Sequence, residues 1–471
     1  MADGSAPITQ IGQQAQRPKP AVARTRLLHE GPIVSTLLRL AAANVVVNVV
    51  LIAVTATVDA YFIGQLGADA LAGISLVFPL IMLMQQVANS SMGGAIASAV
   101  ARAIGAGRHE DASALVVHAA IVAAAMAAVF SGVLLIGGSA IYALMGGHDR
   151  ALVAALEYSN PIFAGALAFW LLSTLTSVVR GAGQAAVLAV VYLAAEALHI
   201  VLVPLLMFGF GPVPSLGIAG VGLATVASFA ASAAFLAWYI ASGRTAIKLS
   251  MRRVVLSRRL FVEILRVGGP MSFQPVLNNI ALATLTGFVA SLGAQELAGF
   301  GIAVRLEYLL YPLSFGLGAA VIAMVGTNLG AGKTARAAQI AWTGAALAAA
   351  ITGCIGLLGV ASPGAWTALF SASPEVHALA ASFLMITGLA YPFLGLGLTL
   401  GSACQAAGKP LWPLLGITAR AVVVMAGGWL VTYILNGGLN GLAIVAASGL
   451  VVYGGSLVIA VRTGVWQRPG S

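Results

Sequence analysis

Charged residues and cysteine are both scarce in this sequence. Only 8% of its 471 residues are charged, against about 25% in an ordinary soluble domain, while 60% are hydrophobic and the mean hydropathy is +1.00. These values exclude an ordinary soluble domain and predict a polytopic membrane protein. The two cysteines, Cys354 and Cys404, lie among apolar or small residues, so we expect buried free thiols rather than a disulfide.

Acidic residues are fewer than basic ones, 13 against 23, which gives a net charge of +10. Such a charge is typical of nucleic-acid binding, but the basic residues gather in one set of alternate loops, and the opposite loops keep only Arg150. This bias follows the positive-inside rule, argues against a nucleic-acid partner and predicts that both termini are cytoplasmic. The first 32 residues are polar and lack an apolar h-region, so we expect a disordered tail and no cleavable signal peptide.

Twelve apolar runs between residues 33 and 462 are long enough to cross a bilayer as helices. Six runs precede and six follow an arginine-rich linker, whose charges either fix the topology or bind anionic lipid heads. The sequence thus predicts an all-α polytopic membrane protein with twelve transmembrane helices in two six-helix lobes. The expected segments are a disordered tail (1–32), an N-lobe (33–242), a basic cytoplasmic linker (243–261), a C-lobe (262–462) and a C-terminal tail (463–471).

Two motifs of the first half recur in the second half. Leu66–Gly73 returns as Leu292–Gly299 at an offset of 226 residues, and Ile104–Arg108 returns as Leu329–Lys333 at an offset of 225. Because six spans per half is an even number, both halves enter the membrane from the same side, and a pseudo-two-fold axis along the membrane normal relates them. Symmetry within one membrane chain is typical of a transporter, whereas a channel more often obtains symmetry from its subunits.

Acidic residues deep within apolar runs are the main candidates for function. A charge at bilayer depth costs about 2.5–3.5 kcal/mol, so such a residue usually faces a cavity or a partner. The first, Asp59, belongs to a polar stripe on one helical face. The stripe comprises Asn44, Asn48, Thr55 and Asp59. A carboxylate with amide and hydroxyl neighbours holds a proton or a small hard cation such as Na⁺; the alternative is a polar seam between helices.

The second acid, Glu196, has Tyr192 and His199 on its own helical face, at i−4 and i+3. A carboxyl group beside an imidazole exchanges a proton near neutral pH, which a coupling site requires. The alternative is that His199 is a core histidine with satisfied hydrogen bonds.

The third acid, Glu307, shares its helical face with Tyr311, whereas Arg305 points elsewhere on the same helix. We expect its partner on another helix, with Arg420 as the candidate, and the alternative role is a static ion pair. Together with polar residues of the seventh span, these residues are predicted to line a C-lobe cavity. The predicted set is Glu307, Arg305, Gln274, Asn278 and Tyr311.

Catalytic and metal-binding patterns are missing from the sequence. It contains no plausible Ser-His-Asp set, no Cys/His cluster with metal-ligand spacing and no nucleotide fingerprint. We therefore expect a protein that is not an enzyme and has no cofactor or metal. Uphill transport without an ATP site has to draw on a gradient of H⁺ or Na⁺.

Several segments, taken in order along this doubled chain, resemble the MATE (multidrug and toxic compound extrusion) family of efflux antiporters, and in particular its bacterial DinF-like branch. They are Val58-Asp59-Ala60-Tyr61-Phe62-Ile63-Gly64, Gly105-Ala106-Gly107, Arg180-Gly181-Ala182-Gly183-Gln184, and Phe208-Gly209-Phe210-Gly211 with Gly217-Ile218-Ala219-Gly220. The resemblance covers roughly residues 30–460. It implies two lobes arranged in a V, drug export driven by H⁺ or Na⁺ entry, and a role for Asp59 in cation coupling.

The chain departs from the family pattern at three places. One is the seventh span, which offers Gln274, Asn278 and Asn279 but no acid, unlike branches that use a carboxylate there. Ala43 stands where the first span often has proline, although the second repeat keeps Pro270, so a bend in the first helix is not expected on this pattern. In the fifth span, His199 and Val203 stand where the related branch has Asn and Asp. Our hypothesis is that Glu196, two turns before Val203 on the same face, replaces the missing acid.

These observations predict a multidrug antiporter of the bacterial plasma (inner) membrane that exports amphipathic or cationic organic compounds in exchange for H⁺, with Na⁺ as the alternative ion. We expect it to act as a monomer whose partners are membrane lipid and small organic molecules. Four residues are candidates for the wall of the drug cavity, with lipid-facing or packing roles as the alternative: Phe78, Met82, Tyr158 and Phe163. The rival function is a flippase for lipids or lipid-linked oligosaccharides within the MATE-like superfamily.

Overall fold

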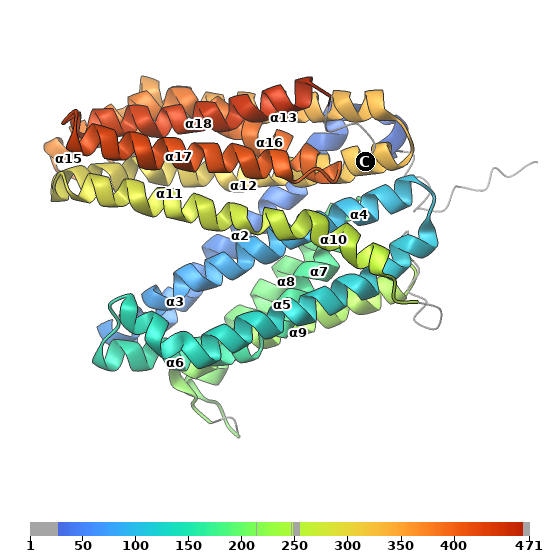
Figure 1. Cartoon of the computed structure of the whole chain (residues 1–471). Coiled ribbons are helices and arrows are strands. Elements are labelled where there is room, and N and C mark those ends of the chain that lie inside the picture. The colour runs from blue at the N-terminus through green and yellow to red at the C-terminus, as the bar shows by residue number, and fades with distance from the viewer. Residues whose placement is uncertain (1–26, 213, 246, 248–254, 465–471) are drawn as a thin grey trace, which may run out of the picture.

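Two helical bundles meet at one end of the molecule and diverge at the other, which gives the V shape seen in Figure 1. The computed structural model describes residues 27–464 apart from 213, 246 and 248–254; for residues 46–56 it describes the backbone but not the side chains. Helix α18 (Gly438–Arg462) ends on the side where the bundles meet. The loops 65–67 and 291–293 lie at the diverging end.

The first bundle is built from the N-terminal half of the chain. Its helices are α2 (Ile33–Gly64), α3 (Ala68–Gln86), the π-helical stretch η1 (Val87–Met92), α4 (Gly93–Gly105), α5 (His109–Leu144), α6 (Asp149–Ala164), α7 (Ala166–Gly181), α8 (Ala185–Phe208) and α9 (Gly217–Ala241). Segments α3, η1 and α4 run on as one span, and α6 and α7 form one span that bends by 52° at Gly165.

The second bundle repeats this order. Its helices are α10 (Arg258–Met271), α11 (Phe273–Ala290), α12 (Ala294–Gly330), α13 (Thr334–Ala361), the short α14 (Pro363–Thr367), α15 (Pro374–Thr387), the 3-10 turn η3 (Gly388–Ala390), α16 (Tyr391–Ala406), α17 (Leu411–Tyr433) and α18 (Gly438–Arg462). Among the described residues, nine helical spans are individually long and apolar enough to cross a membrane, and the bent α6–α7 pair is a tenth. With α2 and α10–α11, the chain has the expected twelve spans in two lobes.

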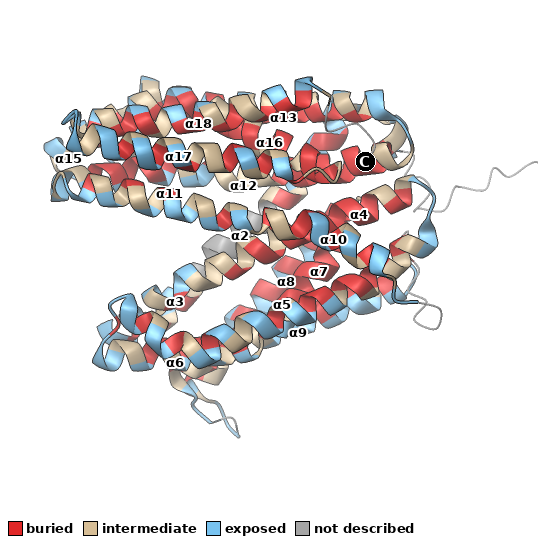
Figure 2. Ribbon diagram, viewed as in Figure 1, coloured by how far each residue is buried: buried red, intermediate tan, exposed pale blue. Residues whose placement is uncertain are grey.

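Buried residues concentrate along the centre of each bundle (Figure 2). Many large apolar side chains are exposed on the outside. This distribution is expected in lipid, where an outward-facing leucine costs nothing. The two cysteines differ: Cys404 is buried, as expected, but Cys354 is exposed on α13, so the prediction of a buried thiol at Cys354 was wrong. Both thiols are free.

The entering helix of each half packs on both bundles. Leu37 and Ala41 in the first part of α2 belong to a core cluster of the second bundle, whereas Ile63 near its end belongs to the first. Conversely, Leu260 and Ile264 of α10 lie in the core of the first bundle, and α11 continues into the second. Each lobe core therefore includes a helix segment from the other half of the chain.

The two entering helices bend differently. Helix α2 is continuous over 32 residues, in line with alanine rather than proline at position 43. In the other half, α10 ends at Met271, directly after Pro270, and α11 begins at Phe273. Proline removes one helical hydrogen bond and clashes with the preceding turn, so the break follows from the sequence.

Glycines bring the two bundles into contact where they meet. A Cβ on Gly105 would overlap the carbonyl of Thr327, and a Cβ on Gly330 would overlap the carbonyl of Arg102. These two contacts are related by the 225-residue offset, since residues 102 and 105 correspond to 327 and 330. The repeat thus builds a quasi-symmetric backbone-to-backbone interface between α4 and α12, which only glycine permits.

Candidate functional site

The carboxylate of Asp59 sits near the end of α2 and is 5% exposed. Its Oδ2 accepts a hydrogen bond of 2.8 Å from the Tyr158 hydroxyl of α6. Its Oδ1 lies 2.9 Å from Nε2 of His199 on α8. Three spans of the N-lobe therefore converge on one carboxylate.

The carboxylate of Asp59 and the imidazole of His199 are in direct contact. The two side chains are only 7% and 4% exposed, respectively. In such surroundings a charge on either group is stabilised mainly by the other. A proton that enters the pair changes its net charge by one unit, and the surrounding apolar residues leave little water to screen that change. A change in the charge of either group therefore alters a buried electrostatic contact between α2 and α8.

A cavity of about 310 Å³ opens beside this carboxylate. Its lining combines apolar side chains of α3, α7 and α9 with a few polar ones, and no described lining residue is basic. The residues that matter for the argument are Asp59, Ser75, Phe78, Met82, Gln85, Tyr158, Phe169 and Thr225. Phe78, Met82 and Tyr158 thus line a cavity, as expected.

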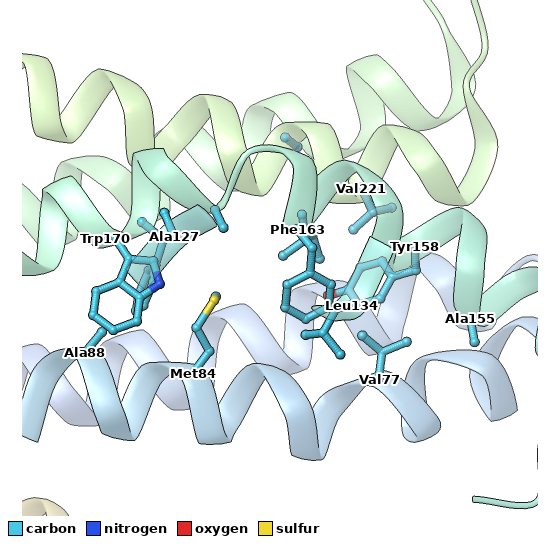
Figure 3. Close-up of a cluster of buried hydrophobic side chains, with 14 of the residues drawn as sticks. Val77, Met84, Ala88, Ala127, Leu134, Ala155, Tyr158, Phe163, Trp170 and Val221 are labelled. Atoms are coloured by element: carbon cyan, nitrogen blue, oxygen red, sulfur yellow. The ribbon is translucent and has the colours of Figure 1, made fainter. Parts of the chain in front are cut away.

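Phe163 does not line this cavity. Its side chain is fully buried in the core of the N-lobe, where it lies beside Leu134 and Tyr158 (Figure 3). The prediction for Phe163 was therefore wrong. It lies two residues before Gly165, where the α6–α7 span bends.

Three side chains on one face of α8 do not all reach the same site: Tyr192, Glu196 and His199. Tyr192 is buried beside Thr176 and Arg180, away from Asp59. Glu196 is 5% exposed and lies one turn before His199. The structure therefore brings His199, but not Tyr192, to the carboxylate of Asp59.

The polar stripe of α2 is only partly described. Asn44 is buried and donates from Nδ2 to the carbonyl of Leu40, 3.0 Å away in its own helix. Fifteen residues of helix separate it from Asp59, about 22 Å at 1.5 Å per residue, so Asn44 does not share a cation with that carboxylate. The side chains of Asn48 and Thr55 lie outside the described residues, and their roles stay predictions.

The C-lobe contains a compact polar cluster around Arg420 of α17. Its Nη2 lies 3.2 Å from Oε1 of Glu307, and its Nη1 donates to Asn278 Oδ1 at 3.1 Å and to the Tyr311 hydroxyl at 3.3 Å. The Tyr311 hydroxyl in turn donates to Glu307 Oε1 at 3.4 Å. The partner expected for Glu307 is thus confirmed, and the geometry is that of an interhelical ion pair.

Two other predicted members of the C-lobe set lie differently. Arg305 is exposed and its guanidinium sits over the ring of Phe370, 4.9 Å from the ring centroid, so placing it in a cavity with Glu307 was wrong. It is two residues from Glu307, hence on the opposite side of α12. Gln274 lies one turn before Asn278 on α11 and is half-buried.

Sequence reasoning missed both contacts of Asp59, the hydrogen bond from Tyr158 and the contact with His199. Tyr158 and Asp59 are 99 positions apart on different spans, so no helical spacing links them. No group of three or more His, Cys, Asp or Glu residues able to hold a metal ion occurs within the described part of the chain.

A family model confirms the duplicated architecture. The model named MatE matches residues 45–205 and again residues 270–430. The chain belongs to the MATE family. The two matches are offset by 225 residues, the same offset as the glycine motifs. Membership makes the chain a multi-pass membrane transporter.

Similar proteins agree with this assignment. The chain is 26% identical over 409 residues to a protein of Shewanella oneidensis named FAD transporter, covering 84% of this chain and 88% of that protein. It is 26% identical over 351 residues to the probable multidrug resistance protein YoeA of Bacillus subtilis, covering 74% and 76%. A solved multidrug resistance MATE family transporter in an outward-facing conformation matches with a TM-score of 0.81 and 23% identity, covering 95% of this chain and 99% of that one.

Proposed function

We propose that this MATE transporter exports amphipathic organic cations across a bacterial plasma membrane in exchange for protons, by alternating access. The observation that carries the proposal is the cavity of about 310 Å³ whose wall includes the Asp59 carboxylate. Aromatic and aliphatic side chains in that wall suit the apolar part of an amphipathic compound. The carboxylate is the matching counter-ion for its positive charge.

The contacts of Asp59 favour H⁺ over Na⁺ as the coupling ion. One oxygen accepts from Tyr158 and the other meets His199, so both oxygens are engaged by groups that exchange or donate protons. A site for Na⁺ requires several oxygen ligands free to turn towards the ion. A protonated Asp59 would release a bound organic cation, and a bound cation would displace the proton.

Glu196 is proposed as a second carboxyl in the relay because it is buried one turn from His199. Its variant Glu196→Gln keeps the shape of the side chain and removes its ability to ionise. We expect this variant to lose coupled transport, and full activity would overturn the role of Glu196.

The C-lobe cluster is proposed to be structural. An arginine is always charged in proteins, so Arg420 requires a counter-ion. Glu307 supplies it, with its Oε1 3.2 Å from Nη2 of Arg420. Loss of the charge on Glu307 would leave the Arg420 guanidinium inside the bundle without its counter-ion. Coupling is therefore assigned to the first lobe.

The orientation proposed for the molecule places its joined end, both termini and the basic linker on the cytoplasmic side, in accord with the positive-inside rule. The diverging end then faces the outside. We propose that the protein acts as a monomer, since both lobes and the cavity belong to one chain.

The test uses purified protein in liposomes loaded with a fluorescent amphipathic cation such as ethidium. An imposed pH gradient should drive dye transport that a protonophore abolishes, and a Na⁺ gradient alone should not. Asp59→Asn should reduce transport to the protein-free background, whereas Asp69→Asn, an exposed acid at the start of α3, should not. Transport by Asp59→Asn at the wild-type rate would overturn the proposal; dye transport driven only by Na⁺ would overturn the choice of ion.

A second candidate substrate is FAD, because a relative matched over 88% of its length is named FAD transporter. The cavity wall weighs against it, since the described lining has a carboxylate and no basic residue to meet a diphosphate. The same liposomes loaded with FAD decide between the two. Driven release of FAD without release of ethidium would replace an organic cation by an anionic nucleotide as the substrate.

A further inference from the structure

A single arginine links three helices where the lobes meet. Arg102 lies in the last turn of α4, and its Nη2 is 3.1 Å from Oε1 of Glu263 on α10. Its Nη1 donates a hydrogen bond of 2.7 Å to the carbonyl of Ala406. The guanidinium therefore ties the N-lobe helix α4 to α16 of the C-lobe and to the entering helix of the second half.

The position of Ala406 makes this bond strong. Ala406 is the last residue of α16, and the last carbonyls of a helix lack intrahelical donors and carry the negative end of the helix dipole. A guanidinium is the side chain best suited to cap such carbonyls while it also pairs with a carboxylate. The side chains of Arg102 and Glu263 are only 16% and 23% exposed, so water screens the pair less than it does a surface pair.

The neighbouring residue on α16 makes the reverse connection. Gln405 is 2% exposed, and its Nε2 donates to the carbonyls of Ser90 and Ser91, each at 3.1 Å. Both serines lie in η1, where the π-helical winding interrupts the regular ladder of α-helical hydrogen bonds. Arg102 thus reaches from the first lobe to the second, and Gln405 reaches from the second to the first.

Among the described residues, the glycine contacts have a counterpart at the 225-residue offset, whereas this pair of hydrogen-bonded connections has none. The 225-residue offset relates Arg102 to Thr327, whose hydroxyl bonds within its own helix to Ala323. The same offset relates Gln405 to Arg180 and Ser90 to Phe315. Arg180 and Phe315 also meet, but as a guanidinium 5.4 Å from a ring centroid.

We infer that Arg102 and Gln405 form a polar clamp that holds the two lobes together at their joined end and so sets the fraction of molecules whose lobes diverge at the other end. The glycine contacts supply shape complementarity, which costs little to separate in the membrane, whereas the clamp supplies the hydrogen bonds that separation must break. The inference rests on the proposed alternation of the lobes.

The test measures distances between lobes by pulsed electron spin resonance in nanodiscs, with Cys354 and Cys404 replaced by alanine. One pair of spin labels, at Glu110→Cys and Ala335→Cys, reports the joined end; another, at Gln65→Cys and Ser291→Cys, reports the diverging end. All four label positions are exposed. Arg102→Ala and Gln405→Ala should each lengthen the first distance and shorten the second. The ratio of molecules whose lobes meet at the joined end to molecules whose lobes are separated there should change about tenfold.

Two further variants separate the clamp from a general loss of structure. Arg102→Lys keeps the charge but has no planar fork for two separate acceptors, so its populations should lie between those of wild type and Arg102→Ala. Arg259→Ala removes another α10 ion pair, with Asp111 at 2.7 Å, which lies outside the α4–α16 junction and should leave both distances unchanged.

The outcomes divide cleanly. Unchanged distance distributions in both Arg102→Ala and Gln405→Ala would overturn the clamp, and so would equal shifts in Arg259→Ala. These measurements need no substrate, so a failure of the clamp leaves the efflux test of Asp59 untouched. Conversely, a protein that fails to transport ethidium but shifts its distances as expected would keep the clamp and lose the proposed substrate.

Discussion

Nε2 of His199 lies 2.9 Å from Oδ1 of Asp59, and both side chains are shielded from solvent. This contact joins α2, the helix that packs on both lobes, to α8 of the N-lobe. Any change in the charge of the pair therefore acts on the helix that connects the two lobes. Under the proposed coupling, a proton that enters the pair would act on one of the two helices that pack on both bundles.

Replacing His199 with leucine should impair transport more than replacing it with asparagine. Leucine leaves the Asp59 oxygen without a donor in a buried setting, whereas the amide of asparagine is able to donate in place of the imidazole. We expect ethidium transport to fall at least tenfold in His199→Leu and severalfold in His199→Asn. The measurement is the initial rate in the liposome assay, normalised to the amount of folded protein. Equal rates in the two variants would contradict a hydrogen-bonding role for the imidazole.

Breaking the C-lobe ion pair should reduce stability rather than transport chemistry. Glu307→Gln leaves the Arg420 guanidinium buried without its counter-ion, which costs about 3–5 kcal/mol. Thermal unfolding in detergent, followed by tryptophan fluorescence, should give a clearly lower midpoint. The double variant Glu307→Gln with Arg420→Met should recover part of the loss.

The matched control is Arg108→Ala, which removes a more exposed pair with Asp111 at 3.1 Å and should change stability by less than about 1 kcal/mol. A normal unfolding midpoint together with lost transport in Glu307→Gln would show that the C-lobe carboxylate takes part in coupling.

The cavity wall and the lobe core should respond differently to substitution. Met82→Trp fills part of the cavity of about 310 Å³ and should reduce transport of large dyes more than that of small ones, with little change in stability. Phe163→Ala empties a fully buried site and should cost about 3–5 kcal/mol. Transport profiles over dyes of graded size, measured beside unfolding midpoints, distinguish the two effects. An equal loss of transport for dyes of all sizes in Met82→Trp would show that the substrate does not bind in this cavity.

Acid should loosen the segment that precedes α2. The helical turn at residues 27–30 docks on the C-lobe, where Asn328 donates to the carbonyl of Leu28 at 3.0 Å. The pKa of His29 is lowered chiefly by burial and also by nearby Lys333, while the backbone of Thr327 opposes the shift. The undocked histidine, with a pKa of about 6.5, therefore binds a proton more readily than the docked one.

Docking of this turn is accordingly strongest above pH ~6.5 and weakens as the pH falls from there to the lowered pKa of His29. Hydrogen exchange of residues 27–32, corrected for intrinsic rates, should reveal less protection at pH ~5.5 than at pH ~7.5. The variant His29→Gln should remove this dependence. The same pH dependence in His29→Gln as in wild type would assign the effect to another group.

The sequence predicted the spans, their number and their duplication because hydrophobic length and glycine spacing are local properties. It did not predict that α2 and α10 pack on the opposite lobes. In lipid, every face of a span is apolar, so the pattern that tells a soluble helix which side to bury carries little information here. The break after Pro270 is the one local sign of that arrangement.

Of the two predicted pairings, Glu307 with Arg420 was confirmed and His199 with Glu196 was wrong. His199 was matched with Glu196 because they share a face of α8, yet its observed partner is Asp59, 140 residues away on α2. Helical spacing identifies neighbours on one helix and is silent about contacts between helices. For the same reason the bond from Tyr158 to Asp59 had no sequence signal, whereas Arg420 was proposed for Glu307 only because each buried charge requires a partner.

The crossing of α2 and α10 between the bundles gives the molecule the connectivity of a domain-swapped dimer fused into one chain. Neither half owns a complete core, so severing the linker between them should yield fragments that need each other to fold. The same crossing fixes where the molecule flexes. The proposed rocking of one lobe against the other would be absorbed within α2 and at the break between α10 and α11.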